Sequence, residues 1–400
     1  MKFVGVLAFI PVLAIATKQW KYSEDPNAKA GVAVGVGATS LNGVDMAASA
    51  MGDNNQGAEI GVYLDEMWNK DSVDSLMVLD AAIMSTGEII SPGVGDLIYS
   101  NSSKPPYYRL ELEYFVMSQS ANVIESTGSF ALVGSFEKKS KDAETINGVM
   151  IMSPQGKIEG VYDINVPSTN YARYGAFPTS DTWYITAGMW PTDDEEVDEL
   201  KKNGKKRLTR QLTLNGNKEV EFNPSPKPKN KTTFTDGDTG YYMSISKTID
   251  GGKTFTTVFS SPQNSYYYPN GVSCWDENHC VVAAEGHDED GNPLVFAFLS
   301  EDGGNTWSNT ITADQTSDEL GMMSVNFLSA DEVWLGGFGL VSRTYQGHFW
   351  RSGDGGKSWT LSDSLDNCLV IDMDFAIPTG TGYAACVPPS GAACTIAMYQ

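Results

Sequence analysis

The sequence predicts an all-β fold: a single β-propeller of six four-stranded blades, with seven as the alternative count. Three observations predict it. A glycine-rich turn motif recurs at a fixed spacing, and short runs rich in β-branched and aromatic residues separate its copies. Helical periodicity is nearly absent, apart from one charged stretch at 193–206.

The repeated motif reads Ser/Thr-x-Asp-Gly-Gly-x-Thr/Ser-aromatic. Its aspartates are Asp250, Asp302 and Asp354, so both intervals are 52 residues, a length typical of a propeller blade. A carboxylate can accept turn N–H groups, glycines permit positive φ, and the aromatic can pack on neighbouring strands. We therefore expect the aspartates to be structural and not catalytic. The other motif positions are Gly251, Gly252, Phe255, Gly303, Gly304, Trp307, Gly355, Gly356 and Trp359.

The order of strands around each motif indicates a blade with the motif between its third and fourth strands. The last blade stops after its third strand at Gln400, and residues 17–23 resemble the missing fourth strand. Pairing of the two chain ends would close the ring and remove open edges. Weak versions of the turn at 84–90 and 152–160, three strong copies and this closure give six blades, while the weakly patterned stretch 31–114 leaves seven open.

The motif resembles the Asp-box, also called the BNR repeat, and the match covers about residues 241–400. That superfamily includes sialidases, other glycoside hydrolases, sortilin-type receptors and propellers like photosystem II assembly and stability factors. The stretches "DMDFAIPTGTGYAACV" and "VNFLSADEVWLGGFG" resemble the last group most closely. The resemblance implies a propeller whose ligand site lies on the face opposite the boxes.

The N-terminal residues 1–16 resemble a secretory signal peptide. One basic residue, Lys2, precedes an apolar run that is too short to span a membrane and ends in Ala14-Ile15-Ala16. We expect cleavage near Ala16 and a secreted single domain over 17–400, with an organelle lumen as the alternative location. A charged loop insertion is expected at about 191–240, and Asn101 and Asn230 begin glycosylation sequons.

Charge and motif content restrict the possible partners. Fifty acidic and 27 basic residues give a net charge of −23, which would repel nucleic acid and anionic membrane surfaces. No later stretch is long enough to span a membrane, and no dinucleotide or phosphate-binding fingerprint occurs, so we expect a monomer without a cofactor. Asp288 and Asp290 are weak candidates for a metal site, because their loop lacks the downstream glutamate of a calcium-binding loop.

All five cysteines follow position 270, which indicates disulfides in an oxidising compartment. Cys274 and Cys280 flank a short turn between two strand-like runs, a spacing that suits a bridge across a hairpin. Cys386 and Cys394 flank a similar turn, which leaves Cys368 over unless it takes one member of that second pair.

Candidate catalytic residues exist but do not form a recognisable set. A sialidase would need three arginines around a substrate carboxylate, for which Arg109, Arg173 and Arg343 are the candidates, yet the Phe-Arg-Ile-Pro motif that marks sialidases is missing. Other glycosidases need two carboxylates at the channel mouth, and Asp45, Asp372 and Asp374 are the acids expected on first strands.

Three functions follow in order of preference. The first is a secreted, non-catalytic module that binds a protein or glycan on the loop face. The second is a secreted glycoside hydrolase, sialidase-like or of another kind. The third is a propeller like the photosystem II assembly factors.

Overall fold

The structure, a computed structural model, describes most of the chain from residue 18 onward. The described ranges are 18–30, 32–41, 44–52, 57–64, 66–74, 78–140, 145–166, 171–188, 243–261, 267–287, 292–311, 315–316, 318–377, 379–390 and 394–400. The expected leader and insertion, and residues Asn230, Asp288 and Asp290, lie outside these ranges.

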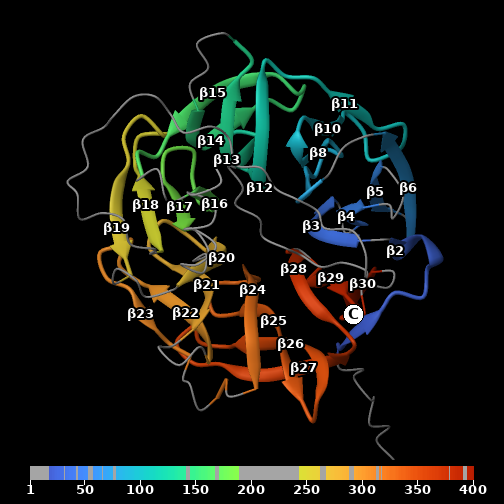
Figure 1. The fold of residues 1–400 in the computed structure, drawn as a ribbon, viewed down its shortest axis with the longest axis vertical. Coiled ribbons are helices and arrows are strands. Elements are labelled where there is room, and N and C mark those ends of the chain that lie inside the picture. Colours follow the sequence, from blue (N-terminus) through green and yellow to red (C-terminus); the bar gives the residue numbers. More distant parts are fainter. Residues whose placement is uncertain are drawn as a thin grey trace, which may run out of the picture.

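Seven antiparallel sheets form a closed ring, so the chain is a seven-bladed β-propeller (Figure 1). The first strands of successive blades contact one another around the centre of the ring. Blade 1 consists of β3 (Val32–Leu41), β4 (Val44–Gly52), β5 (Gly57–Leu64) and β6 (Met67–Asp74). Blade 2 consists of β7 (Ala82–Ile83), β8 (Ile89–Pro92), β10 (Leu97–Ser100) and β11 (Tyr108–Leu110). Blade 3 consists of β12 (Tyr114–Ile124), β13 (Ser129–Lys138), β14 (Thr145–Met152) and β15 (Ile158–Asp163), with β9 (Val94–Gly95) beside β12.

Blades 4 to 7 follow the same order. Blade 4 consists of β16 (Tyr171–Ala176), β17 (Trp183–Gly188), β18 (Ser244–Thr248) and β19 (Thr256–Ser260), and blade 5 consists of β20 (Tyr268–Cys274), β21 (Cys280–His287), β22 (Pro293–Ser300) and β23 (Ser308–Asn309). Blade 6 consists of β24 (Glu319–Phe327), β25 (Val333–Val341), β26 (Thr344–Ser352) and β27 (Thr360–Asp366). Blade 7 consists of β28 (Leu369–Ala376), β29 (Thr381–Val387), β30 (Cys394–Tyr399) and β1 (Trp20–Tyr22), with β2 (Lys29–Ala30) also beside β30. A 3₁₀ turn, η1 (Pro26–Ala28), precedes β2.

The count of six blades was wrong, and the alternative of seven is confirmed. The extra blade is blade 1, whose third and fourth strands are joined by a tight turn at Glu66, with φ 63°, in place of a glycine pair. Blade 1 therefore lacks the motif by which blades were counted. The weak motif at 84–90 connects the first two strands of blade 2, whereas the one at 152–160 does connect the third and fourth strands of blade 3.

The predicted closure by the two chain ends is confirmed. Strand β1 pairs antiparallel with β30, with Trp20 opposite Tyr399 and Tyr22 opposite Ala397. Main-chain N–H of Trp20 also donates to Asp363 Oδ2 of blade 6, at 2.8 Å. The fourth strand of blade 7 is thus supplied from the other end of the chain.

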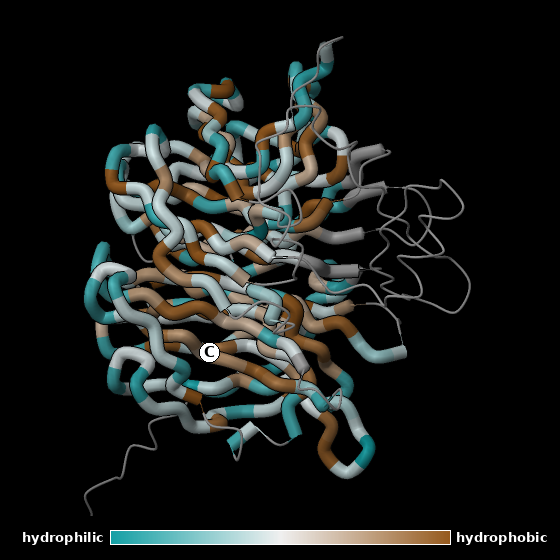
Figure 2. The backbone as a smooth tube through the Cα atoms, turned by 60° about the vertical axis from the view of Figure 1, so that its left-hand side comes forward, coloured by the Kyte–Doolittle hydropathy of each residue, from teal (hydrophilic) through white to brown (hydrophobic). Residues whose placement is uncertain are grey.

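The core is divided among the interfaces between blades. The described buried hydrophobic residues form seven clusters, and each cluster joins two consecutive blades. Hydrophobic stretches accordingly follow the strands, whereas turns are mostly hydrophilic (Figure 2). Gly35 and Gly37 of β3 let blade 2 approach closely, because a Cβ at either position would lie 2.4–2.5 Å from Asp80 or the Ala81 carbonyl.

The ring has two unlike faces. We call the face with the turns after the first and third strands of each blade the turn face, and the opposite face the loop face. The loop face carries the hairpins between second and third strands and the connections between blades. Among the described residues, no helix has the length and hydropathy that a membrane span requires.

Candidate functional site

The repeated motif forms the same hydrogen-bonded turn in blades 4, 5 and 6, on the turn face. In blade 5, Asp302 Oδ1 accepts the N–H of Thr306 at 2.8 Å and Oδ2 accepts its hydroxyl at 2.7 Å. The buried Ser300 hydroxyl accepts the N–H of Gly304 at 2.8 Å and donates to Asp302. Equivalent bonds surround Asp250 and Asp354.

These bonds occupy the carboxylates of the motif. The hydroxyl and N–H of Thr254 lower the pKa of Asp250 to about 2, and the same kinds of donor lower the pKa of Asp302 and Asp354. Both glycines of each pair have φ between 70° and 94°. Three copies with one geometry stabilise three turns.

The aromatic residue that ends each motif packs against the preceding blade. Phe255, Trp307 and Trp359 belong to the clusters between blades 3 and 4, 4 and 5, and 5 and 6. Trp20 has the same place between blades 6 and 7, where its ring stacks on Phe349 with centroids 4.1 Å apart. The N-terminal strand therefore reproduces the end of a motif without its turn.

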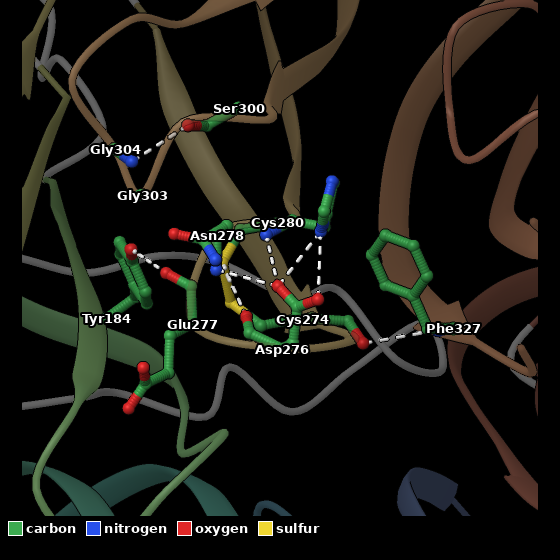
Figure 3. The surroundings of a disulfide bond; sticks show 12 residues. Tyr184, Cys274, Asp276, Glu277, Asn278, Cys280, Ser300, Gly303, Gly304 and Phe327 are labelled. Atoms are coloured by element: carbon green, nitrogen blue, oxygen red, sulfur yellow. Dashed lines mark hydrogen bonds and ion pairs between the residues drawn. A yellow bond between two sulfur atoms is a disulfide. The ribbon is translucent and has the colours of Figure 1, made fainter. Parts of the chain in front are cut away.

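The predicted bridge between Cys274 and Cys280 is confirmed, and it closes the first hairpin of blade 5 on the turn face. Figure 3 shows this hairpin beside the glycine turn of the same blade. The N–H of Gly303 donates to the Asn278 carbonyl at 3.1 Å, and the Tyr184 hydroxyl donates to the Glu277 carbonyl at 2.7 Å. The bridge thus stabilises a hairpin whose carbonyls accept hydrogen bonds from both blade 4 and blade 5.

The expected pairing of Cys386 with Cys394 was wrong, and the alternative, in which Cys368 takes one member of that pair, is confirmed. Cys386 is bridged to Cys368, and Cys394 belongs to neither disulfide. In the register of blade 7, Cys386 lies opposite Thr395, so Cys394 is offset by one residue and faces the other side of the sheet. Cys368 and Cys386 accordingly belong to the cluster toward blade 6, whereas Cys394 belongs to the cluster toward blade 1.

Carboxylates of the central strands accept hydrogen bonds from neighbouring blades. Asp374 Oδ1 accepts the N–H of Phe375, and its Oδ2 accepts the N–H of Ala38 in blade 1 at 2.7 Å. Asp372 follows the same pattern, accepting from Met373 and from Val36 of blade 1 at 2.8 and 2.9 Å. Both lie on β28, the first strand of blade 7, as expected.

Asp80, which the sequence analysis missed, repeats this arrangement between blades 2 and 3. Its Oδ1 accepts the N–H of Ala81 at 2.8 Å, and its Oδ2 accepts the N–H of Ala121 at 2.7 Å. The signal available was the similarity of "LDAAI" to "IDMDF", in which an aspartate stands at or just before a first strand. One geometry at three places indicates carboxylates that join blades.

Burial raises the pKa of all three aspartates. It raises the pKa of Asp372 to about 6 and that of Asp374 to about 7, although the N–H donors oppose the shift. Burial followed by the charge of Asp372 raises the pKa of Asp80 well above its ordinary value. Asp372 and Asp374 therefore titrate near neutral pH.

Asp45 does not lie on a first strand as expected. It belongs to β4, the second strand of blade 1, close to the hairpin on the turn face, and its Oδ1 accepts the Thr379 hydroxyl at 2.5 Å. Asp45 follows the hairpin that joins β3 to β4, so it belongs to the second strand and lies further from the centre of the ring than a first-strand residue would. Asp45 therefore cannot pair with Asp372 and Asp374 along one strand.

The three candidate arginines occupy three different blades. Arg109 lies on β11, the outer strand of blade 2, where its Nε donates to Asp96 at 2.9 Å. Arg343 is exposed at the tip of the hairpin between β25 and β26, with φ 67°. Arg173 lies on the first strand of blade 4. The described contacts bring no two of them together.

Arg173 has surroundings suited to binding a ligand. It is the extra residue of a β-bulge in β16, between Ala172 and Tyr174, and bulges commonly redirect a side chain. Its Nε donates to the Gly188 carbonyl at 3.0 Å, and its guanidinium lies 5.5 and 5.2 Å from the ring centroids of Tyr171 and Tyr268. The Gly188 carbonyl and the first residues of β16 both lie toward the loop face.

No described carboxylate forms an ion pair with Arg173, in a chain of net charge −23. A guanidinium has five N–H donors, and within the described residues only the bond from Nε is made. The terminal amino groups can therefore hold a carboxylate or sulfate in a two-pronged contact. Sequence reasoning singled out Arg173 but missed its two tyrosines, of which Tyr268 comes from the next blade.

The described residues include no group of three or more His, Cys, Asp or Glu side chains placed to hold a metal ion. The weak candidates Asp288 and Asp290 lie outside the described residues. Asn101, the first residue of one sequon, is exposed in the turn between β10 and β11. Its modification stays a prediction.

Comparisons with known proteins show the fold alone. No family model matches the sequence, and no curated protein matches it. A PL25 ulvan lyase, a polysaccharide lyase, has a similar structure: one structure gives a TM-score of 0.52 at 9% identity, and a second, bound to -[GlcA(1-4)Rha3S]-, gives 0.54 at 10% identity. Each comparison covers 92% of this chain and 95% of the other. YCF48 bound to a D1 peptide gives a TM-score of 0.45 at 10% identity, over 96% and 98% of the chains.

Proposed function

We propose that this chain is a secreted, non-catalytic propeller that binds an acidic glycan on its loop face. The observation that carries the proposal is the guanidinium of Arg173, which lies between two tyrosine rings without a described carboxylate partner. An arginine held in this way binds a ligand carboxylate or sulfate through charge-assisted hydrogen bonds. The partly exposed ring of Tyr171 offers a flat surface to a sugar, whereas Tyr268 is buried and packs beneath the guanidinium.

The absence of catalysis is inferred from how the central carboxylates are used. Asp80, Asp372 and Asp374 each accept a main-chain N–H from the neighbouring blade, as well as their own following N–H. A pair of glycosidase carboxylates must instead face the scissile bond and, in an inverting enzyme, a water. We therefore assign these three groups to the scaffold.

Two further observations support a secreted glycan-binding protein. Two disulfides are typical of an oxidising compartment, in agreement with the signal peptide expected at 1–16. A propeller of similar fold, the ulvan lyase, has been determined with a saccharide that contains a uronic acid. That ligand is acidic, as the surroundings of Arg173 require.

The test measures binding of polygalacturonate, alginate and chondroitin sulfate, with neutral dextran beside them, to the immobilised protein. Arg173→Ala should weaken binding of the acidic glycans about 10- to 100-fold, the value of one hydrogen bond to a charged group. Arg173→Lys keeps the charge but loses the planar fork, so it should recover only part of that loss. Arg343→Ala, an exposed arginine on another blade, is the matched control and should bind normally.

Three outcomes would overturn the proposal. Equal binding of dextran and the acidic glycans, or unchanged affinity in Arg173→Ala, would remove the role of Arg173. Reducing ends released from the glycans, or unsaturated uronates detected by ultraviolet absorbance, would contradict the absence of catalysis if Asp374→Asn abolished them.

A further inference from the structure

A cleft opens on the loop face, on another blade than Arg173, beside the strands of the two chain ends. We call it the closure cleft; it encloses about 350 Å³, in the lower range of small-ligand pockets. It lies beside β1, the connection between β27 and β28, and the loop-face end of β29. The lining residues used below are Tyr22, Lys29, Asp366, Asn367, Pro388 and Thr395.

An aromatic ring is fixed at the rim of the closure cleft. The Tyr22 hydroxyl donates to the Asp366 carbonyl at 2.7 Å, while 38% of the residue stays exposed. Burial, with the charge of Asp366, raises the pKa of Tyr22, so the hydroxyl keeps its proton near neutral pH. The ring is thereby held in one place with an exposed apolar surface.

Polar groups beside the ring are held by rigid backbone. Asn367 has a left-handed backbone, φ 56°, and its N–H donates to the Tyr345 carbonyl at 3.0 Å. The next residue, Cys368, is bridged to Cys386 of the cleft wall. Gln346 Nε2 donates to Asp366 Oδ1 at 2.7 Å, which orients that carboxylate. The backbone of the connection and the Asp366 carboxylate are therefore positioned before any ligand arrives.

We propose that the closure cleft binds a neutral saccharide unit. A pyranose has an apolar C–H face and a rim of hydroxyls. The Tyr22 ring matches the face, while the Asp366 carboxylate, Asn367 amide and Thr395 hydroxyl match the rim. Lys29 and Asp366 carry opposite charges, so the lining has no excess of charge to select an acid. This site is on blade 7 and is independent of the acidic-glycan site on blade 4.

The test uses the full chain and saturation-transfer NMR with glucose, galactose, mannose and N-acetylglucosamine at millimolar concentration. At least one sugar should give a signal. Asn367→Gly keeps a backbone that tolerates positive φ and removes only the amide, so it should weaken binding about fivefold, the value of one neutral hydrogen bond. Tyr22→Ala should remove the signal.

The matched controls separate this site from the proposed function. Tyr108→Ala removes a tyrosine that is 57% exposed on blade 2 and should leave sugar binding unchanged. Arg173→Ala should likewise leave it unchanged, while weakening acidic glycans. Circular dichroism checks that the Tyr22→Ala protein, which is altered on the closing strand, is folded. If it is not folded, the Asn367→Gly protein alone decides the test.

Three outcomes would overturn the inference. One is that none of the four sugars gives a signal. Another is a signal that survives in both the folded Tyr22→Ala and Asn367→Gly proteins. The last is a signal from free glycine or lysine with none from any sugar, which would make the cleft a site for zwitterions.

Discussion

Aspartates accept main-chain N–H groups at two levels of the ring, and the two sets respond to pH in opposite directions. On the turn face, hydrogen bonds lower the pKa of Asp250 to about 2, so its stabilising contribution is present above the ordinary value of 3.8 and is lost as the pH falls toward 2. At the centre, burial raises the pKa of Asp374 to about 7. Its contribution is therefore fully present below 3.8 and is lost as the pH rises to 7.

The central aspartates should make the free energy of unfolding fall between about pH 4 and pH 7. Asp374→Asn removes one titrating group, so this dependence should become shallower, whatever the absolute stability. Urea unfolding at a series of pH values measures the slope. Glu24→Gln, at an exposed surface position, is the control and should keep the wild-type slope. A slope unchanged in Asp374→Asn would show that this carboxyl titrates normally.

Within the turn motif, the buried hydroxyl can be tested separately from the exposed carboxylate. Ser300→Ala leaves the buried N–H of Gly304 without its acceptor, which should lower the free energy of unfolding by about 1–3 kcal/mol. Urea unfolding measures the loss, and Ser308→Ala, an exposed serine just beyond the motif, should change stability little. Equal stability of the two variants would contradict the role assigned to Ser300.

At the scale of elements, the closing strand β1 contributes most through one side chain. Trp20 is 2% exposed and stacks on Phe349 in the cluster between blades 6 and 7. Sequence similarity to the residues after a glycine turn was enough to predict this strand, because an aromatic residue directly precedes the fourth strand in blades 4 to 6. The bridge from Cys386 could not be predicted in the same way, since the register of β29 and β30 decides which cysteines share a face.

Trp20→Ala should lower the free energy of unfolding by about 3–5 kcal/mol, the usual cost of removing a large buried aromatic. Differential scanning calorimetry and urea unfolding measure the change. Lys21→Ala alters the neighbouring exposed position of the same strand and should have little effect. A mild loss in Trp20→Ala, close to that of the control, would mean that β1 adds little to ring closure.

Across the whole molecule, the half of the propeller that carries the repeated turn motif could be predicted more fully than the rest. Blades 4 to 6 repeat a local motif, so their turns and fourth strands could be read from the sequence. Blade 1 has no such motif, and its packing depends on the approach of blade 2 to Gly35 and Gly37. The surroundings of Arg173 depend on Tyr268 of another blade, a contact that only the assembled ring provides.

Net charge gives a prediction that also belongs to the whole molecule. A charge of −23 repels an acidic glycan at long range even if Arg173 attracts it locally. Raising salt from about 0.01 to 0.15 M shortens the screening length from about 30 to 8 Å, so the association rate should rise. Surface plasmon resonance measures this rate. An association rate that falls with salt would indicate that the glycan approaches a locally positive surface instead.

The pairing of Trp20 with Tyr399 has a consequence for the timing of biosynthesis. The two positions are 379 residues apart (399 − 20). At roughly 5–20 residues per second, between about 20 and 75 seconds pass between the synthesis of the first residue and that of the second. The opening strand must wait without its partner for all of that time. Its sequence "TKQWKYS" suits the delay, because two lysines flank the tryptophan and discourage association with other nascent chains.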